Sequence, residues 1–264
     1  MNENQNPAAI EMRDVSVGAM RDTSFTVVED VNWMVAPGEF WVIAGQQQSG
    51  KSDFLKMTAG LMAPVKGSYK LFGNETRTFG EAELPERLRL GFVFEGGQLF
   101  NRLTLGENVA LPLQYRHNLT AAAAAQEVES LLDLMELAPL ADVTPANVAA
   151  DWLQRAALAR ALVLKPEVLL LDNPFSGLGA RHLQWSLRFL DRLWRGHEWL
   201  GGKPVTMVVT TDDLSRLAGW RDEARRFALL KDRRFTALGS WSRVEASNDP
   251  VVKELLAVPL AATM

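Results

Sequence analysis

The stretch GQQQSGKS (45–52) decides the fold, because its glycines, lysine and serine have the spacing of a phosphate-binding loop. An apolar run, FWVIAG (40–45), precedes it and is typical of a buried strand. A helical pattern follows directly, over residues 52–62. The stretch therefore joins a strand to a helix, which is the setting in which such a loop holds phosphate groups.

Each anchor residue of this loop has a physical role toward a nucleotide. Gly45 and Gly50 let the backbone turn so that its N–H groups face phosphate oxygens. Lys51 neutralises β- and γ-phosphate charge, Ser52 offers its hydroxyl to Mg²⁺, and the start of the helix adds its dipole. The sequence therefore predicts a site for ATP and Mg²⁺, formed by Gly45, Gln46, Gln47, Gln48, Ser49, Gly50, Lys51, Ser52 and Asp53.

Two features of the loop leave the tightness of binding open. Its glutamines at 46–48 are bulkier than such a loop requires, and Asp53 places a carboxylate in the first helical turn. That carboxylate stabilises the free helix by about 0.3–1 kcal/mol against the macrodipole. It also opposes the α-phosphate of a bound nucleotide. In addition, no aromatic residue that could stack on adenine occurs at 18–20.

Composition limits the class of protein. The chain has 264 residues, 47% of them hydrophobic, which is enough for one large α/β domain. The net charge of −4 gives no general electrostatic case for binding nucleic acid, and the absence of cysteine excludes disulfides and thiolate metal sites. The N-terminal MNENQNPAAIEM has no secretion signal, and no segment has the ~18–20 uninterrupted apolar residues of a membrane span. We therefore expect a soluble, cytoplasmic protein.

Short apolar runs predict further strands at RLGFVFE (89–95), VLLLD (168–172), VTMVVTT (205–211) and RFALLKD (226–232). The central runs are apolar on both faces, as in parallel strands covered by helices on both sides. Near the N-terminus, AIEMRDVSVG and VVEDVNWMVAPGEF alternate more and indicate a smaller antiparallel part. Helical patterns cover 120–136 and 151–164.

These elements predict one α/β domain of the P-loop NTPase type. Residues 1–96 and 164–245 are expected to form a core with a mostly parallel sheet and an N-terminal antiparallel β part. Residues 97–163 have no strong strand signal and are expected to form an inserted helical subdomain. Residues 246–264 are expected to form a C-terminal tail.

Three long stretches carry a resemblance to a known family. They are PGEFWVIAGQQQSGKSDFLKMTAGLMAPVKGSYKLFG (37–73), LGFVFEGGQLFNRLTLGENVALPL (90–113) and RAALARALVLKPEVLLLDNPFSGLG (155–179). In order and spacing they resemble the ATP-binding subunits of ABC transporters. Within that family, GGQLFNRLTLGENVALPL and NDPVVKELL (248–256) are similar to the Mla-like, MCE-associated lipid transporters.

The resemblance implies a function and partners. Such subunits form head-to-tail dimers, in which each ATP lies between the phosphate loop of one subunit and the signature loop of the other. The chain would bind a membrane-embedded permease, a second ABC subunit (identical or different) and an MCE-type substrate-binding protein, but no nucleic acid. Its partners would hold it on the cytoplasmic face of the cell membrane. A non-hydrolysing structural or regulatory subunit of such a complex is the alternative.

The resemblance also shows where this chain departs from the family pattern. Asp172, the Mg²⁺ organiser, is present, together with Ser52. The departures lie at the Q-loop, the position after Asp172, the D-loop, the switch and the signature, which are here Glu95, Asn173, Gly179, Thr211 and the segment VAADW made of Val148, Ala149, Ala150, Asp151 and Trp152. None of these positions keeps its usual catalytic group. We therefore expect weak or absent hydrolysis.

In the family that the chain resembles, a glutamate that polarises the attacking water stands at the position of Asn173. An amide can hydrogen-bond a water molecule but cannot accept its proton, and general-base assistance is typically worth about 10²–10⁴-fold in rate. Glu95 and Asn173 look like a swapped pair, because amide and carboxylate have exchanged positions around the presumed metal. Glu95 could then ligate Mg²⁺ or act as a displaced base; the alternative is that it is a partly solvated loop carboxylate.

Overall fold

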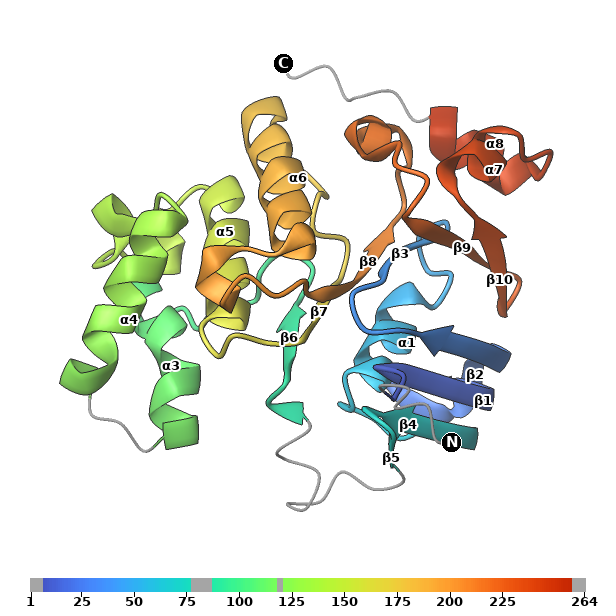
Figure 1. The fold of residues 1–264 in the computed structure, drawn as a ribbon, viewed down its shortest axis with the longest axis horizontal. Helices are drawn as coiled ribbons and strands as arrows, with labels where there is room; N and C mark the ends of the chain where they lie inside the picture. Colours follow the sequence, from blue (N-terminus) through green and yellow to red (C-terminus); the bar gives the residue numbers. More distant parts are fainter. Residues whose placement is uncertain (1–6, 77–86, 118–120, 258–264) are drawn as a thin grey trace, which may run out of the picture.

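The computed structural model describes residues 7–76, 87–117 and 121–257. A ten-stranded mixed sheet runs through them, in the order β5-β4-β1-β2-β10-β9-β3-β8-β7-β6 (Figure 1). The strands are β1 (Ile10–Ala19), β2 (Asp22–Val35), β3 (Phe40–Ala44), β4 (Lys66–Leu71), β5 (Asn74–Glu75), β6 (Leu90–Val93), β7 (Val168–Leu171), β8 (Thr206–Thr211), β9 (Arg226–Lys231) and β10 (Arg234–Gly239). The helices are α1 (Lys51–Thr58), α3 (Leu105–His117), α4 (Ala121–Leu134), α5 (Ala150–Leu162), α6 (Ala180–Arg195), α7 (Trp241–Glu245) and α8 (Pro250–Ala257). The predicted α/β fold class is confirmed.

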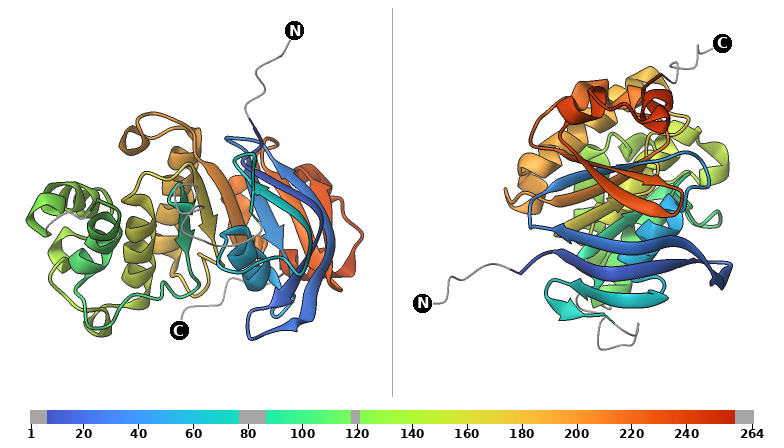
Figure 2. Two further views of the ribbon diagram at one scale, coloured as in Figure 1. Left: turned by 90° about the horizontal axis from the view of Figure 1, so that it is seen from below. Right: turned by 90° about the vertical axis from the view of Figure 1, so that its right-hand side faces the viewer.

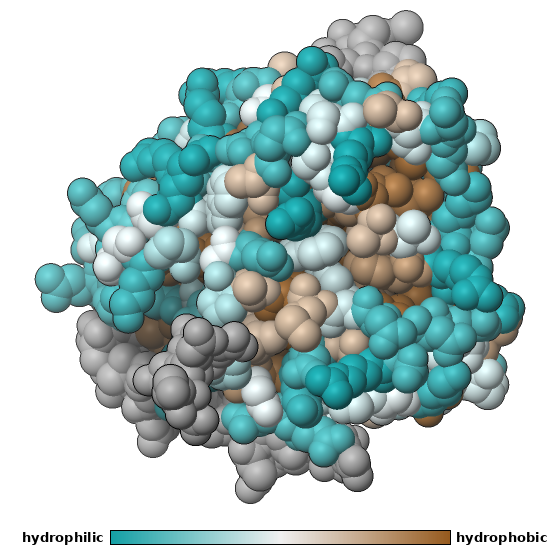
Figure 3. Space-filling model, turned by 45° about the vertical axis from the view of Figure 1, so that its right-hand side comes forward, coloured by the Kyte–Doolittle hydropathy of each residue, from teal (hydrophilic) through white to brown (hydrophobic). Residues whose placement is uncertain are grey.

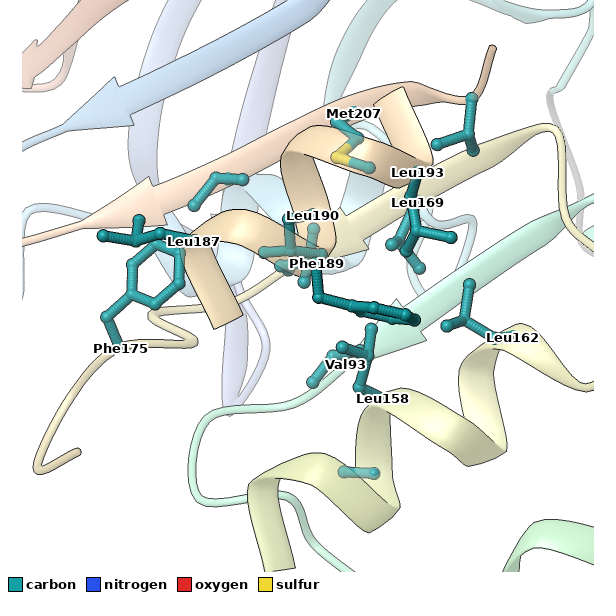
Figure 4. Packing of buried hydrophobic residues seen from close by; sticks show 14 of the residues in the cluster. Val93, Leu158, Leu162, Leu169, Phe175, Leu187, Phe189, Leu190, Leu193 and Met207 are labelled. Atoms are coloured by element: carbon teal, nitrogen blue, oxygen red, sulfur yellow. The ribbon is translucent and has the colours of Figure 1, made fainter. Parts of the chain in front are cut away.

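The centre of the sheet is parallel and buried on both faces. β3 pairs in parallel with β8 and β9, and β7 pairs in parallel with β6 and β8. Successive side chains of β3 enter different cores: Val42 packs in the cluster that contains α5 and α6, and Ile43 in the one that contains α1. The first of these clusters is seen in Figure 4, where Phe189 of α6 lies between the sheet and Leu158 of α5. The continuous apolar runs in the sequence follow from this two-sided burial.

The N-terminal part is antiparallel, as predicted. β1 pairs antiparallel with both β2 and β4, and β4 with β5. The bridge between Arg234 and Glu29 joins β10 to β2 and so connects this part to the rest of the sheet. Helix α1 packs against its inner face, because Phe54 and Leu55 belong to the same buried cluster as Ile10.

Helices α3, α4 and α5 lie at one end of the molecule, and β1 and β2 lie at the other (Figures 1 and 2). Among the described residues of 97–163 there is no strand, in agreement with the sequence pattern. Helix α1 is shorter than predicted: it ends at Thr58 rather than Met62, because Gly60 takes a left-handed conformation with φ +71°. The part of the expected C-terminal tail that is described includes α8, and its final seven residues lie outside the described residues.

No helix in the described part of the chain is long and apolar enough to cross a membrane. On the face drawn in Figure 3, apolar residues gather toward the middle and hydrophilic ones surround them. The large hydrophobic side chains that are exposed on the described surface are Met20, Phe25, Met34, Leu61, Val65, Phe100 and Tyr115.

Candidate nucleotide-binding site

The phosphate loop leaves β3 and turns directly into α1, and its two glycines are needed for that path. Gly50 has φ +93° and precedes the first residue of the helix. A side chain at Gly45 would place its Cβ 2.6 Å from the carbonyl oxygen of Leu230. At Gly50 a Cβ would lie 3.3 Å from Val27 of β2. The neighbouring strands therefore hold the loop close to them, at the N-terminal end of α1, where the helix dipole favours an anion.

Lys51 is buried, and the loop itself binds its ammonium group. Its Nζ donates to the carbonyl oxygens of Gly45 at 2.6 Å and Gln46 at 2.7 Å, and to Oγ of Ser49 at 3.3 Å. Burial lowers the pKa of Lys51, while the charges of Asp212, Asp172 and Glu95 oppose that shift. The lysine is therefore held inside the loop, and a phosphate would replace some of these internal acceptors.

A hydroxyl and a carboxylate meet at the predicted magnesium position. Oγ of Ser52 donates to Oδ1 of Asp172 at 3.0 Å, and Oγ1 of Thr210 donates to the same oxygen at 2.9 Å. Oxygen ligands of this kind, completed by phosphate oxygens and water, are those that Mg²⁺ prefers. Among the described residues there is no group of three or more His, Cys, Asp or Glu that could hold a metal by itself. The donor set thus fits a cation that is bound together with a nucleotide.

The structure brings Glu95 and Asn173 into direct contact. Nδ2 of Asn173 donates to Oε1 of Glu95 at 2.8 Å, although the two residues are 78 positions apart. The backbone N–H of Asn173 donates to Oγ1 of Thr210 at 2.9 Å, so the residue is fixed at both ends. Its φ of +44° lies in the left-handed region, where asparagine is several-fold enriched. The exchanged amide and carboxylate are therefore one hydrogen-bonded unit beside Asp172.

Two of the three glutamines of the loop bind acidic side chains outside it. Nε2 of Gln46 donates to Glu254 of α8 at 2.8 Å, and Nε2 of Gln47 donates to Asp212 at 3.4 Å. Gln48 has φ +63°. Asp53 lies in the first turn of α1, as predicted. The side chains of Gln46 and Gln47 therefore connect the loop to Glu254 and Asp212.

The signature-like segment 148–152 contacts its own chain rather than the phosphate loop. Ala149 precedes the first residue of α5. Oδ1 of Asp151 accepts a hydrogen bond from the backbone N–H of Gly179 at 3.3 Å, and its Oδ2 lies 3.8 Å from Nε2 of His182. The ring of Trp152 meets His182 edge-on at 4.8 Å between centroids. The structure thus brings the predicted signature and D-loop positions together, at the start of α6.

Thr211 is also engaged internally. Its Oγ1 donates to the carbonyl oxygen of Asp213 at 3.1 Å and accepts from the N–H of the same residue at 3.1 Å. The side chain is buried, with 2% of its surface exposed. The switch-position hydroxyl is therefore not free to contact a phosphate in this conformation.

Two residues that the sequence did not single out organise this region. Thr210 joins Asp172 to the backbone of Asn173, and its only sequence signal is a hydroxyl near the end of an apolar strand. Nη1 of Arg216 donates to the carbonyl oxygens of Phe175 at 2.7 Å and Leu178 at 3.0 Å. Its Nε lies 3.4 Å from Asp213. Arg216 thus connects the turn after Asp172 to the segment after β8. No local sequence pattern predicts such a contact.

Comparison with known proteins decides the family. A family model described as "ABC transporter" matches residues 28–176. The chain belongs to this family. The sulfate/thiosulfate import ATP-binding protein CysA of Mesorhizobium japonicum is 33% identical over 215 residues, covering 80% of this chain and 58% of that protein. Its namesake in Bordetella pertussis is 38% identical over 208 residues, covering 76% and 55%. This ABC protein thus spans about half the length of these curated relatives.

Solved ABC cassettes share the fold. A dimeric post-hydrolysis state of the ATP-binding cassette MJ0796, bound to ADP and Pi, has a TM-score of 0.73 at 27% identity and covers 88% of this chain and 100% of that chain. This likeness supports the predicted P-loop architecture. The relatives named above import sulfate or thiosulfate, so the narrower prediction of an Mla-like, MCE-associated lipid transporter has no support from them.

Proposed function

We propose that this ABC protein is the ATP-binding subunit of a membrane transporter, and that it binds Mg-ATP at residues 45–53 and hydrolyses it slowly. One observation carries the proposal. Lys51 is held within the loop and Ser52 is bound to Asp172, so the groups that would face phosphate and metal are in place, whereas the residue after Asp172 is an amide. Binding chemistry is therefore kept, and the usual base is missing.

Binding would use groups that are already in place. The N–H groups of the loop and the start of α1 face the β- and γ-phosphates, and Lys51 exchanges its bonds to Gly45 and Gln46 for phosphate oxygens. Ser52 and Asp172 would hold Mg²⁺, which supplies charge neutralisation of the phosphates.

Turnover would be slow for three separate reasons. Asn173 cannot take a proton from water, which is worth about 10²–10⁴-fold in rate. The hydroxyl of Thr211 is bound to Asp213. In the signature-like segment, Asp151 places a carboxylate where a partner's γ-phosphate would approach, and that carboxylate is bound to Gly179. These losses need not add, because such groups act as a unit.

Partners, location and substrate are proposed from the family. We infer a permease in the membrane, with residues 95–105 forming part of the groove that accepts it, and a second ABC subunit, with this chain on the cytoplasmic face. The substrate that the relatives' names favour is an inorganic oxyanion such as sulfate, in place of the lipid that the sequence suggested. Loss of labelled-sulfate uptake in cells that lack this gene, with lipid transport unchanged in the same cells, would support the oxyanion; unchanged sulfate uptake with loss of lipid transport would restore the lipid.

Equilibrium binding of ATP, with and without Mg²⁺, tests the core of the proposal. Lys51→Ala should weaken ATP binding about 10–150-fold, since a hydrogen bond to a charged group contributes about 1.5–3 kcal/mol and each 1.4 kcal/mol is tenfold. Lys253→Ala removes an equal charge from exposed Lys253 of α8 and should leave the affinity unchanged. Failure of the parent to bind ATP would refute the proposal. Binding without phosphate release above the Lys51→Ala background would favour the non-hydrolysing regulatory subunit.

A further inference from the structure

Glu95 and Asn173 both depart from the family pattern, and their side chains make a direct hydrogen bond beside Asp172. The amide of Asn173 donates to Oε1 of Glu95 at 2.8 Å. Resting on the proposed binding of ATP, we propose that the Glu95 carboxylate, positioned by Asn173, accepts the proton of the water that attacks the γ-phosphate. Asn173 is then a positioning residue, and Glu95 the base.

A continuous chain of hydrogen bonds fixes this pair relative to the metal position. Ser52 donates to Asp172 at 3.0 Å, Thr210 donates to the same carboxylate oxygen at 2.9 Å, and the N–H of Asn173 donates to Thr210 at 2.9 Å. The side chain of Asn173 then reaches Glu95. Three successive hydrogen bonds therefore hold the carboxylate of Glu95 in a fixed position relative to Asp172.

The carboxylate is also available to a water molecule. Glu95 is exposed, and among the described residues its Oε2 has no hydrogen-bond partner, so one oxygen is oriented by Asn173 and the other is open. Its negative charge acts on Lys51, the residue expected to hold the γ-phosphate, which places the two groups in the same electrostatic neighbourhood. The chain turns sharply after Glu95, since Gly96 and Gly97 have φ +68° and +77°.

The backbone conformation at position 173 suits an asparagine. Asn173 has φ +44°, a region in which asparagine is enriched because its short side chain can hydrogen-bond locally. An amide at 173 and a carboxylate at 95 keep one acid and one amide in the site.

The reaction balances without a further reactant. The oxygen of the water forms a bond to the γ-phosphorus, one of its O–H bonds breaks, and the proton passes to Glu95. The bond between the γ-phosphorus and the bridging oxygen breaks, and ADP keeps the electron pair. The products are ADP and inorganic phosphate, and Glu95 returns its proton to solvent. No group is oxidised or reduced.

A double-mutant cycle tests the assignment, with ATP turnover and Mg-ATP affinity measured on each full-length variant. Glu95→Gln keeps an acceptor for Asn173 but removes the base, so turnover should fall about 10²-fold or more with affinity unchanged. Asn173→Ala should lower turnover about tenfold, and the double variant should be no slower than Glu95→Gln alone. Glu245→Gln, at an exposed position of α7, is the matched control and should behave as the parent.

The outcomes separate this inference from the proposed function. Unchanged turnover in Glu95→Gln, or no turnover in the parent above Lys51→Ala, overturns the base while leaving ATP binding intact. A loss of affinity in Glu95→Gln that appears only when Mg²⁺ is present identifies a metal ligand and also overturns the base. Failure of the parent to bind ATP refutes the proposed function itself.

Discussion

Arg155 should stabilise the start of α5 through its neighbouring rings rather than through its ion pair. Its side chain is 2% exposed and its guanidinium lies 3.8 Å from the centroid of Trp185 and 4.7 Å from that of Trp152. Nη1 also lies 2.9 Å from Glu136, whose side chain is 49% exposed. Burial lowers the pKa of Arg155, and Glu136 opposes that shift.

The magnitudes decide between the two interactions. Each cation–π contact contributes about 0.5–2 kcal/mol, and the buried stem of Arg155 adds about 0.8 kcal/mol per methylene. An ion pair to a half-exposed carboxylate contributes about 0–1 kcal/mol. Two of the guanidinium nitrogens, Nε and Nη2, are buried without hydrogen-bond partners, which offsets part of the gain. Arg155→Ala should therefore lower the free energy of unfolding by about 3 kcal/mol, Arg155→Met by about 1 kcal/mol, and Glu136→Gln by at most about 0.5 kcal/mol.

Urea unfolding of the three variants, followed by circular dichroism, measures these differences. The slope with denaturant should not change, so that the midpoints report stability alone. Arg181→Ala, at an exposed position of α6, controls for loss of positive charge and should stay within about 0.5 kcal/mol of the parent. If Glu136→Gln costs as much as Arg155→Ala, the ion pair dominates. Equal losses in Arg155→Met and Arg155→Ala would exclude the packing of the stem.

Three further changes probe other parts of the molecule. Arg216→Ala removes two donors from backbone carbonyls of the 175–178 turn; it should lower the free energy of unfolding by about 2 kcal/mol, and a urea measurement below about 0.5 kcal/mol would contradict this role. Asp53→Asn should destabilise α1 by about 0.3–1 kcal/mol and tighten ATP binding several-fold, and calorimetry that finds weaker binding would refute the repulsion. Burial lowers the pKa of His197 below its usual 6.5, and the charge of Arg192 lowers it further. The unfolded chain then binds a proton that the folded one does not, so stability falls as pH drops below about 6.5, and His197→Gln should flatten that acid limb in unfolding measurements made at successive pH values.

The local elements could be predicted from the sequence because their causes are local. The phosphate loop follows from spacing alone, and Gly45 and Gly50 have the close neighbours that such a loop requires. The strands of the central sheet can be recognised as apolar runs, since both of their faces are buried. The sequence pattern predicts an end of α1 that lies beyond the observed one, because a glycine near the end of a helical pattern does not show whether it takes the left-handed conformation.

Contacts between distant segments were harder to predict, because they depend on the strand order. β8 lies between β3 and β7, and only this order puts Thr210 beside Asp172. The bond from Gln46 to Glu254 joins residues 208 positions apart, and nothing in either stretch indicates the other. The Glu95–Asn173 contact could be anticipated for a different reason. The family pattern places both positions around one metal, so the sequence alone shows that amide and carboxylate have been exchanged there.

An ATP site between two subunits would combine the phosphate loop of one with the signature-like segment of the other, and these two parts differ in this chain. On the phosphate side, Lys51 is bound to a carbonyl oxygen of the loop and Ser52 to Asp172, and these groups need only exchange partners to take up ATP. On the side that would face a second subunit, Asp151 is bound to Gly179 within the chain, and its charge would repel a phosphate. In a dimer formed around ATP, Asp151 would therefore add repulsion to the partner's γ-phosphate rather than a favourable contact. We infer that the contacts of Lys51, Ser52 and Asp172 within one subunit would contribute more to ATP binding than the contact with a second subunit.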